Sequence, residues 1–144
     1  MKKLLGLLGV ILISISTYGQ SVSASKIISF IESQNKTEIT QKLKILDFTY
    51  KGESEIIGNL KEYKFYTTSK YGTELISIGQ NDELFFVTYK LANSNFFNSL
   101  EEKLLTSKFQ YAYSYKNTKY YESSNMRIGV DIKNNILSFF VALK

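Results

Sequence analysis

Apolar residues recur at helical spacing in three segments of the 144-residue chain, which predicts three helices. Two of these helices also have polar start signals. Asn35 is followed three residues later by Glu38, and Ser99 stands in the same relation to Glu102, as in a capping box. An earlier start near Asn95 is the alternative for the last helix. The apolar positions are Ala24, Ile27, Ile28 and Ile31; Ile39, Leu43 and Leu46; and Phe97, Leu100 and Leu104.

Elsewhere the apolar period changes to two, which predicts strands. Residues 126–132 alternate apolar and polar side chains, as expected of a strand with one wet face. Asn81-Asp82 and Asn134-Asn135 mark hairpin turns. The segments after these turns, 84–91 and 136–143, are apolar on both faces and should lie centrally in a sheet or be covered on both sides. Further strands are expected near residues 48–51, 61–67, 109–116 and 119–123.

The chain aligns with itself. Residues 66–90 align without a gap on residues 120–144, at an offset of 54, with seven of 25 positions identical. Upstream of this block the offset is 61, so that residues 48–50 align with 109–111. The difference fits an insertion at 51–59, which is expected to be a loop. We infer a duplication; chance similarity in a chain of low sequence diversity is the alternative.

Each copy therefore comprises one helix and four antiparallel strands, with repeat one at about 36–91 and repeat two at about 92–144. Together they predict an α+β fold, a tandem duplication with about eight strands in one sheet and the helices on one face. This element order is similar to that of the β-lactamase-inhibitor-protein fold and to the saddle sheet of the TATA-box-binding protein. The resemblance implies that the uncovered face or its loops bind something, but it identifies no functional residue.

The first residues have the features of an export signal. Lys2 and Lys3 precede an apolar run at 4–15, which is shorter than the roughly 20 residues that span a bilayer. The small residue Gly19 predicts cleavage before Gln20. An uncleaved anchor is the alternative.

We therefore expect a signal peptide at residues 1–19 and a single mature domain at 20–144, periplasmic or secreted, with no membrane span. The Tyr-Gly-Gln ending of the signal, in a chain rich in Lys, Asn and Ile, resembles exported proteins of the Bacteroidota. The mature chain would carry 16 basic and 13 acidic residues, so its net charge falls from +5 to +3. These charges are interspersed, which favours a solvated surface and gives no basis for a nucleic-acid partner.

The chain has no cysteine or histidine, which excludes thiolate and imidazole metal sites, Ser-His and Cys-His nucleophile pairs, and disulfides. Carboxylates remain for acid–base chemistry, but a glycosidase needs two that face each other about 5 to 9.5 Å apart in a cleft. No such pairing is evident, and we expect no enzyme activity, cofactor or metal. The carboxylates, expected to be solvated, are Glu53 and Glu55 in the loop, Asp82, Glu83, Glu101, Glu102 and Asp131.

Tyrosines are the candidates for binding, because they combine a large rigid contact area with a hydroxyl group. Tyr111, Tyr113 and Tyr115 have a spacing of two and are expected to share one face of a strand. Tyr120 and Tyr121 follow immediately.

The alignment of the two copies divides these tyrosines. Tyr111 matches an aromatic residue of the first copy and is expected in the core. Tyr113 and Tyr115 match Gly52 and Ser54, so they are the better candidates for an exposed contact.

These observations predict a small exported, non-enzymatic binding or inhibitory module for an envelope or extracellular protein. Its expected contact residues are Tyr113, Tyr115, Tyr120 and Tyr121. The alternatives are a soluble structural accessory of a cell-envelope assembly and a carboxylate-based hydrolase. Composition and spacing do not define the partner or the oligomeric state.

Overall fold

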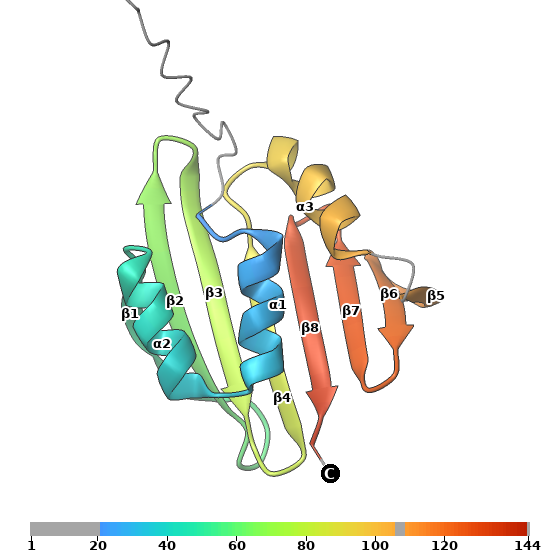
Figure 1. Ribbon diagram of the computed structural model, residues 1–144, viewed down its shortest axis with the longest axis horizontal. Helices are drawn as coiled ribbons and strands as arrows, with labels where there is room; N and C mark the ends of the chain where they lie inside the picture. Colours follow the sequence, from blue (N-terminus) through green and yellow to red (C-terminus); the bar gives the residue numbers. More distant parts are fainter. Residues whose placement is uncertain (1–20, 106–108, 144) are drawn as a thin grey trace, which may run out of the picture.

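A computed structural model describes residues 21–105 and 109–143, which fold into three α-helices packed against one eight-stranded antiparallel sheet (Figure 1). The predicted α+β class is confirmed. The expected signal peptide and its cleavage site lie outside the described residues. The helices are α1 (Ala24–Ser33), α2 (Lys36–Ile45) and α3 (Phe97–Leu104), and the strands are β1 (Thr49–Glu55), β2 (Lys61–Ser69), β3 (Gly72–Gln80), β4 (Leu84–Lys90), β5 (Gln110–Tyr115), β6 (Thr118–Ser123), β7 (Met126–Asp131) and β8 (Ile136–Ala142).

The strands form two meanders of four that meet in the middle of the sheet. Their spatial order is β1-β2-β3-β4-β8-β7-β6-β5, so that β4 and β8 are the central pair and β1 and β5 are the edges. The central pairing runs from Leu84 opposite Ala142 to Lys90 opposite Ile136. The two strands that are apolar on both faces are therefore central, as predicted.

All three helices lie on one face of the sheet (Figure 1). In this view α1 lies along the middle of the sheet, α2 lies over β1 and β2, and α3 lies over the second meander. The apolar side chains along one face of each helix pack against every second side chain of the strands and form one continuous core. The fully buried large side chains include Ile27, Phe30 and Ile31 of α1, Ile39 and Leu43 of α2, Phe97 of α3, and Phe65, Ile76, Ile78, Phe85, Tyr89 and Phe139 of the sheet.

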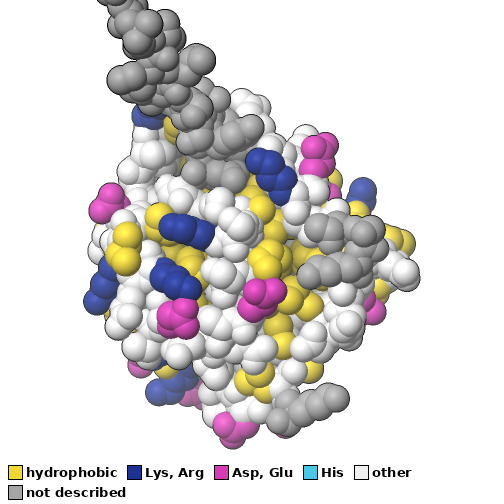
Figure 2. Space-filling model, viewed as in Figure 1, with side chains coloured by type: hydrophobic (Ala, Val, Ile, Leu, Met, Phe, Trp, Pro, Cys, Tyr) yellow, Lys and Arg dark blue, Asp and Glu magenta, His cyan; other side chains and the backbone are white. Residues whose placement is uncertain are grey.

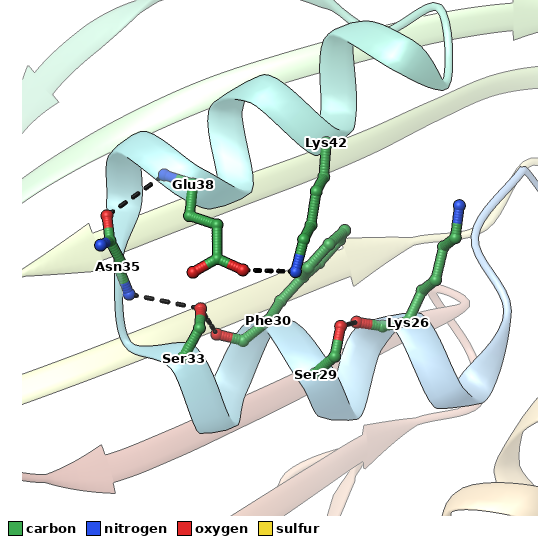
Figure 3. Close-up of polar contacts among 7 residues, drawn as sticks. All are labelled: Lys26, Ser29, Phe30, Ser33, Asn35, Glu38 and Lys42. Atoms are coloured by element: carbon green, nitrogen blue, oxygen red, sulfur yellow. Dashed lines mark hydrogen bonds and ion pairs between the residues drawn. The ribbon is translucent and has the colours of Figure 1, made fainter.

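The corner between α1 and α2 is held by local polar contacts (Figure 3). The Asn35 side chain accepts a hydrogen bond from the Glu38 backbone N–H at 3.1 Å, which confirms the predicted start of α2. Glu38 also pairs with Lys42 one turn later, and the Ser33 hydroxyl donates to the Phe30 carbonyl. These bonds stabilise the end of α1 and the beginning of α2.

The start of α3 differs from the prediction of a capping box at Ser99. A 3₁₀ turn, Ser94–Phe96, leads directly into the helix at Phe97. Asn93 caps this turn by accepting a hydrogen bond from the Asn95 backbone N–H at 2.8 Å. The earlier start near Asn95 is thus the correct alternative, because an asparagine side chain upstream already satisfies the first free N–H group.

The predicted loop at 51–59 is also largely wrong. Strand β1 continues to Glu55, and only the short turn from Ile56 to Leu60 joins it to β2. Glu53 and Glu55 are therefore strand residues. Gly52, with φ 143°, lies at a β-bulge on this strand, a conformation that a glycine adopts without strain.

The two meanders repeat the same element order, but their hairpins are not in the register of the gapless alignment. Gln80 and Phe85 close the β3–β4 turn, whereas Asp131 and Ile136 close the β7–β8 turn. The offset between these turns is 51 residues rather than 54. The second turn therefore comes three residues earlier than the alignment predicts.

The edge strands, in contrast, agree with the upstream offset of 61. The pairing of β1 with β2 shifts register between Tyr50 and Gly52. The pairing of β5 with β6 shifts between Tyr111 and Tyr113, which are the aligned positions of the second copy. Both copies thus have a β-bulge at the same place on their outermost strand.

A buried carboxylate ties the start of the described chain to the sheet. Glu74, on the helix side of β3, is fully buried. It accepts hydrogen bonds from the Ser21 backbone N–H at 2.9 and 3.1 Å and from the Tyr89 hydroxyl at 2.9 Å. Burial, with the nearby Glu74 charge, raises the pKa of Tyr89 well above the ordinary value of 10.

Replacing Tyr89 by Phe should lower the free energy of unfolding by about 1–3 kcal/mol at neutral pH, since Glu74 loses its side-chain donor. Above about pH 10 the unfolded chain releases the Tyr89 proton while the folded chain retains it, so this residue makes stability fall by up to about 1.4 kcal/mol per pH unit. The variant should lack that contribution. Urea unfolding between pH 8 and 11 measures both effects, with Tyr66→Phe as an exposed control. Equal pH dependence in wild type and Tyr89→Phe would contradict this account.

Candidate functional site

The face of the sheet opposite the helices, here called the open face, has a polar row across its middle strands and a cluster of tyrosines at one end. Strand pairing defines its rows, because partners side by side project to the same face. Figure 2 shows the other, helix-covered face, where basic and acidic side chains are mixed. One open-face row crosses all eight strands in the order Gly52, Lys64, Ser77, Thr88, Ser138, Gly129, Tyr120 and Tyr113.

Three tyrosines and an ion pair gather at the β5–β6 end of this face. The rings of Tyr113 and Tyr120 stack with centroids 4.8 Å apart and planes inclined by 25°. Arg127 of β7 donates from Nη1 to the Tyr113 hydroxyl at 3.3 Å and from Nε to Glu122 at 2.8 Å. We call Tyr113, Tyr115, Tyr120, Glu122 and Arg127 the Tyr113 patch.

Solvent reaches the predicted contact residues on β5. Tyr113 is 42% exposed and Tyr115 is 60% exposed. The Lys116 ammonium lies 5.2 Å from the Tyr115 ring centroid, and the Arg127 guanidinium carbon lies 5.6 Å from that of Tyr113. Each ring thus has a cation close enough for a cation–π contact.

Tyr111 and Tyr121 do not belong to this patch. The prediction that Tyr111 shares a face with Tyr113 and Tyr115 is wrong, because the bulge at Ala112 inserts one extra residue and reverses the alternation. Tyr111 lies opposite Tyr121 on the helix side, with ring centroids 5.9 Å apart. Tyr121 packs against the core, so only three of the four predicted contact tyrosines lie together.

The expectation that Tyr111 lies in the core is wrong as well, since 58% of this residue is exposed. Its counterpart Tyr50 is 49% exposed. Both residues occupy edge strands, which have a neighbouring strand on one side only. The core at these edges is instead completed by Phe48 and Phe109, which precede the two strands and are buried.

Glycines on the open face make room for aromatic rings. A Cβ atom at Gly129 would lie 3.1 Å from Cε1 of Tyr120, so the Tyr120 ring rests on the bare backbone of β7. In the first meander the Phe86 ring covers Gly79 in the same way, and a Cβ atom at Gly79 would lie 2.0 Å from Cε1 of Phe86. Gly129 thus permits a close contact between β7 and the Tyr120 ring, and Gly79 lies within the regular pairing of β3 with β2 and β4.

Sequence reasoning did not find Arg127 or Glu122. A signal was nevertheless present, since Arg127 is the only arginine beside 17 lysines. Its planar guanidinium can stack on an aromatic ring while it binds a carboxylate, which a lysine ammonium does less well. A single arginine next to a tyrosine-rich segment therefore indicates a specific contact.

A shallow hollow of about 380 Å³ adjoins the Tyr113 patch. Arg127 and Glu122 belong both to its lining and to the patch, and its walls include apolar side chains of the central strands. Such a hollow could receive a side chain of a molecule that docks on the open face. It is lined by Leu84, Glu122, Ser124, Asn125, Met126, Arg127, Phe140 and Ala142.

Two further carboxylates, Asp131 and Glu101, lie outside the Tyr113 patch. Asp131 accepts hydrogen bonds from the backbone and side-chain nitrogens of Asn134 at 3.0 and 2.8 Å, which holds the β7–β8 turn. Burial raises the pKa of Glu101 on α3, although nearby Lys119 opposes this shift. In residues 21–105 and 109–143 no group of three or more acidic side chains could hold a metal ion. No helix in the same ranges is long and apolar enough to cross a membrane.

Comparison with known proteins adds no relative. The chain matches no protein-family model, and it has no significant match among characterised proteins or among solved structures. The similarity in element order noted above therefore carries no further argument about function.

We expect Gly129→Ala to disturb the Tyr113 patch without removing any of its side chains. The added methyl group would meet Tyr120 at 3.1 Å and Thr118 at 3.2 Å, so the Tyr120 ring must shift by a few tenths of an ångström. We expect a loss of about 1 kcal/mol in stability and weaker Tyr113–Tyr120 ring contacts in the aromatic NMR spectrum. Ser138→Ala, beside Gly129 on the same face, is the control. Unchanged ring contacts in Gly129→Ala would show that the glycine does not position Tyr120.

Proposed function

We propose that this chain is a small exported, non-enzymatic binding module, and that the Tyr113 patch is its contact surface for a protein of the cell envelope or the extracellular space. The observation that carries the proposal is the position of Tyr113, Tyr115 and Tyr120. They lie together on the face that the helices leave open, and Tyr113 and Tyr115 are exposed to solvent.

The chemistry of the patch suits a protein partner. Tyrosine and arginine are enriched among the residues that dominate protein–protein binding energies. Arg127 is paired with Glu122, and the other cation against the rings of the patch is Lys116, whereas a nucleic-acid backbone requires several such charges. The adjoining hollow adds a place for an inserted side chain.

The patch is also preorganised. Tyr113 is held by the Tyr120 ring and by Arg127, and Tyr120 rests on Gly129. Ordering a free side chain on binding costs about 0.5–1.5 kcal/mol. Side chains that are already ordered avoid much of this cost, so they can contribute more of their contact energy to affinity.

The first meander lacks such a patch. At the positions that align with Tyr113 and Tyr115 it has Gly52 and Ser54, on the equivalent side of an equivalent bulge. The backbone of the two edges is thus shared, while the aromatic side chains occur on only one of them. This difference favours a role for the tyrosines in binding rather than in the stability of a meander.

The proposal predicts that Tyr113→Ala/Tyr115→Ala abolishes capture of a protein from envelope or secreted fractions by the immobilised chain that begins at Gln20. Once the partner is identified, the double variant should weaken its dissociation constant about 30-fold or more, because each lost anchor costs about 1 kcal/mol or more.

The matched control is Tyr50→Ala/Tyr111→Ala, which removes two exposed tyrosines from the helix side and should bind as the wild type does. Equal losses in both variants would contradict the proposal. Retention of envelope glycan instead of a protein would replace the protein partner with a carbohydrate.

A further inference from the structure

The two edges of the sheet differ in how they are protected. An edge strand presents unpaired N–H and C=O groups, and proteins commonly guard it with charged side chains, glycine or proline, or a bulge. Strands β1 and β5 both contain a bulge. Only β1 also carries charges, namely Lys51, Glu53 and Glu55, and it includes Gly52.

Strand β5 has none of these further devices. Its sequence is Gln-Tyr-Ala-Tyr-Ser-Tyr, with no charge, glycine or proline. All six of its residues are exposed, including Tyr111 and Tyr115 at 58% and 60%. A six-residue uncharged segment of high β propensity on an open edge is well suited to pair with another strand.

The tyrosines of β5 already pack against tyrosines of the adjacent strand β6, both on the helix side and on the open face of the sheet. Toward β6, Tyr111 meets Tyr121 edge-on, and Tyr113 stacks on Tyr120. A second strand of the same sequence on the outer side would extend these tyrosine rows. It would bring no like charges opposite each other, and a two-fold axis would satisfy both edges at once.

We infer that the chain forms a dimer in which β5 of one copy pairs antiparallel with β5 of the other. The two sheets then become one continuous sheet of sixteen strands. Its ends are the charged β1 strands, which stop further addition. The two Tyr113 patches come to lie on either side of the junction, although the inference itself rests on the edge strand and not on the proposed function.

The dimer is tested by single spin labels, since the chain has no native cysteine. Labels on Ser114→Cys, in β5, should lie within about 20 Å of each other across the junction, because paired strands are only about 5 Å apart. Labels on Ser54→Cys, in β1, should lie roughly 70 Å apart, at opposite ends of the joined sheets. Sedimentation of the exported protein over a range of concentrations gives the oligomeric state. A monomer at all concentrations, or a dimer with the β1 labels close together, would overturn the inference.

Charge on the edge supplies a second test. Tyr111→Lys/Ser114→Lys places two lysines on the helix side of β5 and leaves the Tyr113 patch intact, so a loss of dimer is separable from a loss of partner binding. The dimer dissociation constant should rise about tenfold or more. Tyr50→Lys/Ser54→Lys adds the same charge to β1 and should have no such effect. Circular dichroism verifies that each variant is folded. Equal dimerisation of both variants would contradict pairing through β5.

Discussion

The antiparallel pairing of β4 with β8 joins the two copies into one sheet, and the rest of the architecture is arranged around it. On the helix side this pairing aligns Val87 with Phe139 beneath α1, and on the open face it aligns Phe86 with Phe140. A strand that is this apolar on both faces is stable only where it has a neighbouring strand on each side. Each meander therefore has its most apolar strand at the junction and its most polar strands outward. As a consequence, β1 and β5 are the edge strands of the sheet.

The open face takes its character from this arrangement. The helices of both copies cover the same side, so each copy contributes the other side of four strands to one continuous surface. Near the centre of this surface the side chains of Thr88 and Ser138, which are small and polar, lie opposite each other. Beside this pair the Phe86 and Phe140 rings lie on the same face, and tyrosine rings gather only at the β5–β6 end. A bulge at Ala112 turns Tyr113 onto this face, and the missing side chain of Gly129 gives Tyr120 its place.

Local sequence patterns predicted the elements whose causes are local. Asn35 caps its helix through residues next to it in the sequence, and strands that are apolar on both faces favour a central or covered position. The sequence did not reveal the face of Tyr111, because a bulge depends on how two strands pair and leaves no mark in the spacing of tyrosines. The three-residue difference between the hairpins has the same cause, because it too depends on how the strands pair. Arg127 was missed because its partners come from two other strands.

We propose, above all, that a protein partner docks on the open face at the Tyr113 patch and not on the helix side. Site-specific photo-cross-linking in the cells that make the protein tests it most directly, with a benzophenone amino acid placed at one position at a time. Positions 113 and 120 should give a discrete covalent adduct with one protein other than a second copy of the chain. Positions 50 and 111, equally tyrosine in the native chain, should not give this adduct. The same adduct from positions 50 and 111, or no adduct from 113 and 120, would contradict the claim.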